Sequence, residues 1–203
     1  MNRALIVIDM QNDFCLPAAD LFVAGAPACT PKVIAAVAGF RAAGLPIVWV
    51  TRRQRPDGSD VDRSRRALFA ARPFLVESPG CDLVDGLRVR PGEYEIVKRR
   101  WSAFFGTDLD ALLRRLRIER TYLCGVQTPN CIRGTALDAN ALDYECVVLS
   151  DATASATAAV QQANLFDMRN MGIEILTTAA ALAEVQRPSE AGPGTAASCS
   201  RSR

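Results

Sequence analysis

The chain has 203 residues, of which 49% are hydrophobic and 23% are charged, values that are ordinary for a globular protein. Lys and Arg total 24 against 22 for Asp and Glu, so the formal net charge is only +2. Dedicated nucleic-acid binders carry a strong basic excess, and a bilayer-spanning helix needs about 20 apolar residues in a row. Neither pattern is present, so we expect a small-molecule ligand and neither nucleic acid nor membrane as a partner.

Histidine does not occur anywhere in the sequence. This excludes Ser-His-Asp and Cys-His catalysis and most catalytic zinc sites. The seven cysteines form no C-x-x-C pair, and their odd number predicts free thiols in a reducing compartment. Residues 1–3 lead directly into five apolar residues, too few for the core of a signal peptide. We therefore expect a cytoplasmic protein that transfers protons through carboxyl, amine, phenol or thiol groups.

Short apolar runs alternate with helical patterns along the chain. Strands are predicted at 4–8, 45–51, 94–98, 121–125, 145–150 and 172–176. Helices are predicted at 30–43, 62–71, 107–116, 128–142, 155–170 and 179–185. Apolar strands that alternate with amphipathic helices are typical of a parallel sheet covered on both faces. We expect the α/β class, as a three-layer α/β/α sandwich with a mainly parallel six-stranded sheet.

Two segments interrupt this alternation. Residues 52–93 form a long insertion rich in Arg, Pro and Gly, and loops of this length usually cover a site or pack irregularly. Residues 186–203 lack apolar periodicity and are predicted to be a disordered tail that follows one domain, residues 1–185.

Three polar residues lie where open parallel sheets place their sites, at the carboxyl ends of strands. Asp9 follows the first predicted strand, Lys98 ends the third, and Cys131 lies in the first turn of the helix after the fourth. With Thr128 as the N-cap and Pro129 at the first position, the helix dipole and the Lys98 ammonium should acidify the Cys131 thiol. Asp9 could then accept the thiol proton and return it to a leaving group, while Lys98 keeps Asp9 ionised.

Each of these residues also has a plainer interpretation. Asp9 could cap a turn, Lys98 begins a basic run typical of a solvated surface, and Cys131 could be an inert core thiol, as we interpret Cys124 and Cys146. Their common place at strand ends favours catalysis.

Several neighbouring residues leave two roles open. Gln11 and Asn12 could orient Asp9 or a neighbouring loop. Arg133 could bind a substrate carboxylate or form a surface ion pair, and one of the arginines of the insertion could bind an anionic substrate. Aspartates interleave with those arginines and no aromatic platform accompanies them, which does not favour nucleic-acid binding.

Three ordered motifs resemble the isochorismatase-like cysteine hydrolases over residues 3–178. They are LIVIDMQNDFC at 5–15, VKRRWSAFFGTDL at 97–109 and CGVQTPNCIRGTALDANALDY at 124–144. The resemblance implies a catalytic triad of Asp9, Lys98 and Cys131. It also implies a cis peptide bond before Gln127, an oxyanion hole formed by the backbone N–H groups of Gln127 and Cys131, and a homo-oligomer, either dimer or tetramer.

The nicotinamidase-like subgroup resembles this chain further, in VQTPNCIR at 126–133 and in segments at 78–87 and 164–173. Members of that subgroup hold a metal with one Asp and two His after the second strand, where this chain reads TRRQRP at 51–56. We therefore expect neither a metal nor another cofactor. The retained Cys131 favours hydrolysis of a small amide, carbamoyl or ureido compound through a thioester. A catalytically silent binding protein and a vinyl-ether hydrolase are the alternatives, and we interpret Phe14 and Trp101 as pocket walls.

Overall fold

A computed structural model describes residues 1–186 of the chain. Its centre is a six-stranded sheet in the order β3-β2-β1-β4-β5-β6, and all five strand pairings are parallel. The strands are β1 (Arg3–Ile8), β2 (Ile47–Arg52), β3 (Tyr94–Lys98), β4 (Arg120–Val126), β5 (Glu145–Ala154) and β6 (Glu174–Leu176). The strand order changes direction between β1 and β4, and open parallel sheets bind ligands at the carboxyl ends of the strands beside such a point.

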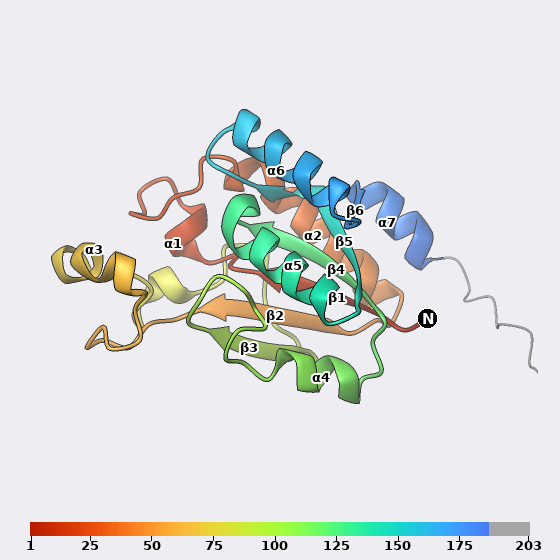
Figure 1. Cartoon of the computed structure of the whole chain (residues 1–203), viewed down its shortest axis with the longest axis horizontal. Coiled ribbons are helices and arrows are strands. Elements are labelled where there is room, and N and C mark those ends of the chain that lie inside the picture. The colour runs from red at the N-terminus through yellow and green to blue at the C-terminus, as the bar shows by residue number, and fades with distance from the viewer. Residues whose placement is uncertain (187–203) are drawn as a thin grey trace, which may run out of the picture.

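Helices cover both faces of the sheet, which confirms the predicted three-layer arrangement (Figure 1). They are α1 (Asn12–Cys15), α2 (Ala26–Ala42), α3 (Arg66–Ala71), α4 (Leu109–Arg115), α5 (Arg133–Ala141), α6 (Ala158–Asn170) and α7 (Thr178–Val185). Side chains of α2 and α7 share one buried cluster, and those of α4, α5 and α6 share the other. Successive residues of β1 alternate between the two clusters, because side chains alternate across a strand. β1 is therefore apolar from Ala4 to Ile8.

Helix α2 begins four residues before the predicted start at Thr30. Thr30 is not the N-cap, because its hydroxyl donates a hydrogen bond to the carbonyl oxygen of Ala26, 2.8 Å away inside the helix. Pro31 lies inside the helix, and Gly25 precedes its first residue. Pro27 lies at the start of the helix instead, where a missing N–H costs nothing.

The predicted helix over 128–142 consists of two parts. Residues Thr128–Ile132 form a π-helical turn, η3, and α5 follows directly. Gln127 is the N-cap, whereas the predicted cap, Thr128, is the first helical residue and its buried hydroxyl has no partner within residues 1–186. The wider turn arises because the Gln127 carbonyl accepts hydrogen bonds from both Asn130 and Ile132, each at 3.1 Å.

The predicted helix over 155–170 begins later, at Ala158. Strand β5 continues to Ala154, and the Thr157 hydroxyl then caps α6 by accepting a hydrogen bond from the Val160 N–H. The last strand is shorter than the predicted 172–176, because β6 spans only Glu174–Leu176.

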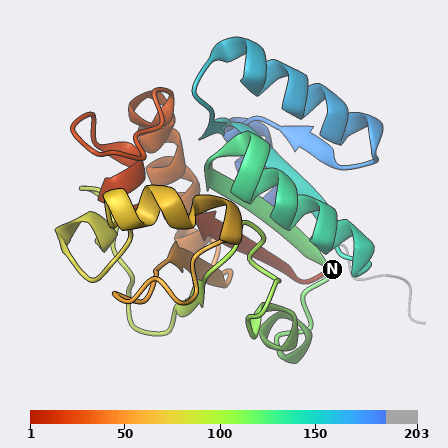
Figure 2. The same ribbon diagram turned by 60° about the vertical axis from the view of Figure 1, so that its left-hand side comes forward.

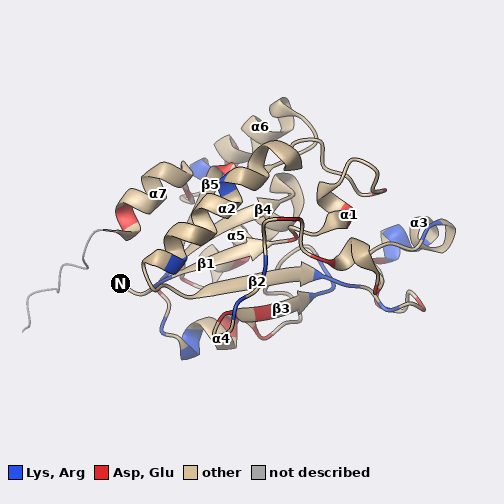
Figure 3. Cartoon of the chain, turned by 180° about the vertical axis from the view of Figure 1, so that it is seen from behind, with Lys and Arg blue, Asp and Glu red and all other residues tan. Residues whose placement is uncertain are grey.

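The insertion lies at the carboxyl ends of the strands. It contains two short 3₁₀ turns, η1 (Arg63–Arg65) and η2 (Pro79–Cys81), and the short helix α3. Figure 2 turns this end of the molecule forward and shows the gold helix α3 crossing in front of it. Blue segments of Lys and Arg lie at and beside α3, where Arg66 begins the helix and η1 precedes it (Figure 3). The insertion therefore contributes charged side chains beside the strand ends.

Two expectations concern segments beyond this architecture. The predicted tail over 186–203 lies, except for Gln186, outside the described residues. Within residues 1–186, no helix combines the length and the apolar composition needed to cross a bilayer.

Candidate active site

The structure brings Asp9, Lys98 and Cys131 together at the carboxyl ends of three different elements. The Lys98 ammonium lies 2.7 Å from Asp9 Oδ2 and donates a hydrogen bond to Cys131 Sγ at 3.3 Å. Asp9 and Lys98 are fully buried, and Cys131 is 4% exposed. The ammonium also donates a hydrogen bond to the Arg100 carbonyl oxygen at 3.0 Å.

The backbone around Asp9 is shaped by the close approach of β1 and β4. Asp9 has φ 53°, an uncommon conformation for a residue other than glycine, and its N–H donates to the Val50 carbonyl at 2.8 Å. Opposite, Gly125 has φ 113°, and a Cβ there would lie 1.9 Å from the Ile8 carbonyl oxygen. Glycine at 125 thus lets β4 run close enough to β1 for Asp9 and the turn carrying Cys131 to meet.

Burial raises the pKa of the Cys131 thiol to about 12, and the negative charge of Asp9 adds to this shift, while Lys98 and Arg52 lower it. The expectation of an acidified thiol is therefore wrong, because burial outweighs the ammonium and the helix start. A raised thiol pKa means that attack by the Cys131 sulfur needs a base that takes the proton as the new bond forms. Asp9 is the carboxylate nearest to that proton.

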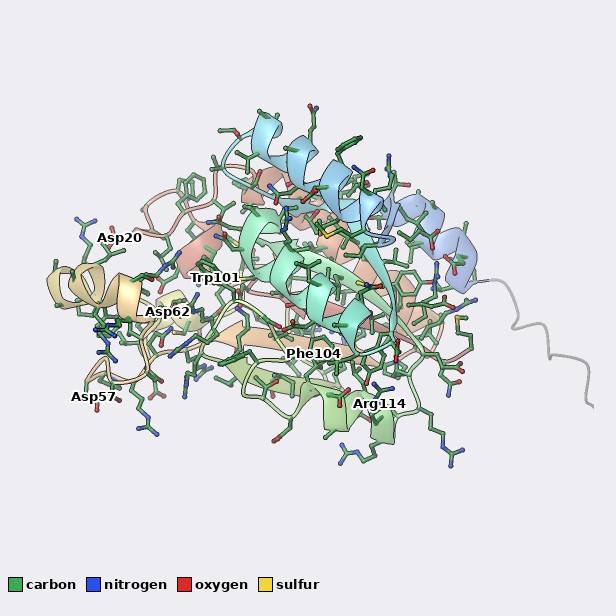
Figure 4. The ribbon with its side chains drawn as sticks, viewed as in Figure 1. Asp20, Asp57, Asp62, Trp101, Phe104 and Arg114 are labelled. Carbon is green, nitrogen blue, oxygen red and sulfur yellow. The ribbon has the colours of Figure 1, made fainter. Side chains whose placement is uncertain are left out.

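A cavity of about 240 Å³ opens beside the sulfur. Its lining includes Cys131 and Gln127 together with both predicted pocket walls, Phe14 and Trp101. Phe14 is buried, whereas Trp101 is 46% exposed and forms part of the rim. Figure 4 labels Trp101, Asp20 and Asp62, which lie at this end of the molecule. A small planar group fits a space of this size next to a thiol.

Three charged lining residues were not individually assigned to the pocket from the sequence: Asp20, Arg52 and Arg65. Arg52 is 1% exposed, and its guanidinium pairs with Asp62 of the insertion. Arg65 comes from η1, and its guanidinium carbon lies 5.8 Å from the centroid of the Trp101 ring. The position of Arg52 at the end of β2 was a sequence signal for the site. Asp20 and Arg65 lie outside the strands, and the sequence pattern did not indicate that their side chains reach the cavity.

Gln11 serves the loops around the site and makes no contact with Asp9. Its side-chain amide donates to the Arg52 and Cys81 carbonyls, both at 3.0 Å, and its oxygen accepts from the Arg52 N–H at 2.7 Å. It thereby ties the end of β2 and η2 to the turn after β1. Asn12 donates to the Pro79 carbonyl at 2.9 Å and holds the same loop.

Other candidate residues lie away from the cavity. Arg133 pairs with Asp167 and donates to Asn164 at 3.1 Å, so it joins α5 to α6 within the chain. Cys124 is fully buried in β4, and Cys146 is buried in β5. Both have the surroundings of core thiols.

The predicted oxyanion donors lie beside the sulfur. The Val126–Gln127 peptide bond is cis, and Gln127 and Cys131 both line the cavity. The Gln127 backbone N–H has no hydrogen-bond acceptor within residues 1–186. This donor is therefore available to a ligand oxygen.

The residues after β2 do not fit a metal ion. The Arg52 guanidinium and its partner Asp62 occupy this place, and a fixed positive charge there repels a cation. In the part of the chain that the structure describes, no three His, Cys, Asp or Glu side chains are grouped as metal ligands. Two carboxylates of the insertion are instead paired with arginines, Asp60 with Arg99 and Asp62 with Arg52 and Arg100.

Comparison with curated proteins finds relatives over most of the chain. A probable inactive nicotinamidase of Arabidopsis thaliana is 43% identical over 181 residues, which cover 87% of this chain and 92% of the relative. The ureidoacrylate amidohydrolase RutB of Cronobacter turicensis is 36% identical over 188 residues, covering 82% and 81% of the two chains.

Solved structures share the fold. An isochorismatase family protein of Desulfovibrio vulgaris superposes with a TM-score of 0.87 at 43% identity and covers 92% of this chain and 99% of its own. The N-carbamoylsarcosine amidase of Thermoplasma acidophilum has a TM-score of 0.75 at 29% identity, with 88% and 97% covered. The isochorismatase domain model matches residues 3–180. This chain therefore belongs to the isochorismatase family of hydrolases.

Proposed function

We propose that this protein is a cysteine-dependent hydrolase that cleaves a C–N bond of a small amide, carbamoyl or ureido compound. The observation that carries the proposal is the buried Lys98 ammonium, which contacts both the Asp9 carboxylate and the sulfur of Cys131, a residue that lines the cavity. A lysine is rarely buried unless it is paired, and here its two side-chain partners are a base and a nucleophile.

The proposed reaction begins with the Cys131 thiol. Its sulfur attacks the substrate carbonyl carbon while Asp9 takes the thiol proton, since the raised pKa leaves little thiolate at neutral pH. The resulting oxyanion accepts hydrogen bonds from the Gln127 and Cys131 backbone N–H groups, each contributing about 3 kcal/mol. The C–N bond then breaks, and Asp9 gives its proton to the leaving nitrogen.

The second half returns the protein to its starting state. Asp9 takes a proton from water, the hydroxide oxygen bonds to the thioester carbon, and the C–S bond breaks. The proton returns from Asp9 to the sulfur, so one amide and one water yield one acid and ammonia or an amine. Lys98 stays protonated throughout and holds both side chains in place.

Relatives support this substrate class. RutB is named for the hydrolysis of ureidoacrylate, and the Thermoplasma structure is named an N-carbamoylsarcosine amidase. Both names describe a compound in which a carbonyl carbon bears a nitrogen leaving group. Nicotinamidase activity is not part of the proposal, because the segment after β2 carries Arg52 in place of metal ligands.

A second candidate is a catalytically silent binding protein of the same fold. It is favoured by the Arabidopsis relative, which is 43% identical and bears the name probable inactive nicotinamidase. The silent protein would bind small molecules without turning them over. Turnover therefore has to be measured directly.

The test is ammonia release from a panel of small amides, carbamoyl compounds and ureido acids. We expect Cys131→Ala to lower the rate at least about 10³-fold while its circular dichroism spectrum and melting temperature stay close to wild type. Cys146→Ala is the matched control, since it also removes a buried thiol but one outside the cavity, and it should retain the rate. Equal activity of Cys131→Ala and wild type would overturn the proposal, and no turnover of any compound would favour the silent protein.

A metal-independent reaction makes a separate prediction. Incubation with EDTA followed by gel filtration should leave ammonia release unchanged, because no proposed step uses a metal. A loss of activity that zinc restores would contradict it. Release of pyruvate from isochorismate without ammonia from any amide would instead indicate the vinyl-ether reaction.

A further inference from the structure

We propose that Arg65 binds a carboxylate of the substrate, so that the preferred substrates are small amide or carbamoyl compounds that also carry one carboxylate. This inference rests on the proposed function, because it concerns the cavity beside Cys131. It assigns a specificity role to a residue of the insertion and restricts the substrate class to anions.

The first argument is position. Arg65 lines the same cavity as Cys131 and lies beside the Trp101 ring, with 5.8 Å between the guanidinium carbon and the ring centroid. An aromatic face holds a guanidinium through cation–π attraction and leaves its edge donors free for a ligand. Trp101 itself forms the rim, so the guanidinium lies where a ligand enters.

The second argument is charge. Three charged side chains line the cavity, and two of them already have partners within the protein. Arg52 pairs with Asp62, and Asp20 pairs with Arg72. Arg65 forms no salt bridge within residues 1–186. Within the triad, Asp9 and Lys98 pair with each other, and burial raises the pKa of the Cys131 thiol, which disfavours its charged form. The cavity therefore presents one uncompensated positive charge.

The third argument is shape. The remaining wall is mostly apolar, formed by Phe14, Leu21, Phe22 and Trp101, and the volume is only about 240 Å³. A ligand that contacts both Cys131 and Arg65 has to fit within this volume. A planar carboxylate matches the two parallel N–H donors of a guanidinium, whereas a neutral amide or ester matches them poorly.

Arg133, the other arginine considered for this role, is already occupied. It pairs with Asp167 on α6 and does not line the cavity. The insertion therefore supplies the anion-binding group, and the helix that carries the nucleophile does not.

The experiment compares two alkylating reagents of nearly equal shape, iodoacetate and iodoacetamide, which differ by one negative charge. In each reaction the methylene carbon of the reagent bonds to Cys131 Sγ and iodide leaves. The proton of the Cys131 thiol goes to a base. Rates at Cys131 are read by peptide mass spectrometry on the folded full-length protein. The ratio of the iodoacetate rate to the iodoacetamide rate reports the preference for a carboxylate, and the urea-unfolded chain supplies the intrinsic ratio.

We expect the ratio at Cys131 in wild type to exceed that of the unfolded chain and to fall at least about 10-fold in Arg65→Gln, as loss of a charge-assisted hydrogen bond implies. Arg65→Lys should give an intermediate ratio. Arg66→Gln, the matched control, removes the same charge from an exposed neighbour outside the cavity and should leave the ratio unchanged. The wild-type preference should also weaken at high salt.

Two results separate this inference from the proposed function. If Cys131 reacts readily but the ratio is the same in wild type and Arg65→Gln, the carboxylate inference fails and the cysteine hydrolase remains. If Cys131 reacts with neither reagent faster than Cys124 does, the proposed function fails first. An equal fall of the ratio in Arg65→Gln and Arg66→Gln would also overturn the inference, because it would indicate a diffuse surface charge.

Discussion

Asp9 and Lys98 form the buried ion pair on which the proposed chemistry depends, and neither side chain is exposed. Burying a carboxylate and an ammonium costs several kcal/mol each, and their attraction offsets this only while both are present. Lys98 also donates hydrogen bonds to Cys131 and to the Arg100 carbonyl, so its loss leaves the Asp9 carboxylate without its cation and two acceptors without their donor. The pair thus links stability and reactivity at one place.

Lys98→Met should lower the free energy of unfolding by about 3–5 kcal/mol, because it leaves the Asp9 charge buried and unpaired. Urea denaturation monitored by fluorescence measures the change. The matched control is Arg99→Met, which removes the next cation along the chain; its side chain is 41% exposed, so we expect a loss below about 1 kcal/mol.

The double variant Asp9→Asn, Lys98→Met distinguishes an unpaired charge from lost packing. It should recover much of the stability that Lys98→Met loses, while ammonia release stays absent. A double variant no more stable than Lys98→Met would show that the unpaired Asp9 charge is not the cause.

The sequence predicted these residues better than it predicted their chemistry. Asp9, Lys98 and Cys131 follow apolar strands, so the topology rule alone brought them to one edge of the sheet. The ionisation of Cys131 was mispredicted, since sequence spacing gives the helix start but not the depth of burial that raises the thiol pKa. Arg65 lies in the insertion, and its place beside Trp101 depends on tertiary packing that the sequence pattern does not give.

Among the secondary-structure elements, β4 is the one that depends on a single glycine. Gly125 has φ 113°, and its missing side chain faces the backbone of β1 at Ile8. Because backbone cannot move aside as a flexible side chain can, an added methyl group has to separate the two strands. That separation would displace Asp9, which directly follows Ile8.

Gly125→Ala should therefore destabilise the protein by several kcal/mol and lower ammonia release in the fraction that folds. Gly172→Ala is the control: its φ is also positive, at 88°, but nothing lies within 4 Å of the added Cβ. Backbone strain alone should cost it about 1–3 kcal/mol with activity retained. If urea denaturation finds the same loss of unfolding free energy in both variants, the argument from the close approach of β4 to β1 is refuted.

The elements were predictable where pattern and burial agree. β3 has the predicted bounds, because a short strand-like run of residues follows soon after a Pro-Gly pair that favours a turn. Helix ends were less predictable: Thr30 and Thr128 both look like caps in sequence, yet one bonds back into α2 and the other begins η3. Local capping patterns compete with bonds from neighbouring turns, and spacing alone does not decide between them.

At the scale of the whole molecule, buried thiols couple stability to alkaline pH. Burial raises the pKa of Cys15, Cys29, Cys131 and Cys146 from 9.0 to about 12. Above pH 9 the unfolded chain releases these protons while the folded protein keeps them. The stabilisation is complete below about pH 9 and is lost as pH rises toward 12.

We therefore expect the free energy of unfolding to be nearly constant from pH 7 to 8.5 and to fall steeply between pH 9 and 11. Each such thiol contributes about 1.4 kcal/mol per pH unit to the slope. Urea denaturation with a reductant present measures the unfolding free energy at each pH. Cys29→Ala should reduce its pH slope by the contribution of one thiol, about 1.4 kcal/mol per pH unit, whatever its effect on stability at pH 7. A flat profile up to pH 11 would contradict this account.

The resemblance to the isochorismatase-like hydrolases also implies that the whole molecule is a homo-oligomer, either a dimer or a tetramer. Light scattering during gel filtration should give a mass of two or four chains of 21.9 kDa each. A mass of one chain at micromolar concentration would contradict the expectation.

The most direct test of the central claim, a reactive Cys131 beside Asp9, is the rate at which iodoacetamide modifies each cysteine at pH 7. Peptide mass spectrometry should find Cys131 modified at least about tenfold faster than Cys124 and Cys146, because only Cys131 combines the cavity with an adjacent base. Asp9→Asn should slow Cys131 and leave the other two unchanged. Equal rates at all three cysteines in the folded wild type would contradict the account.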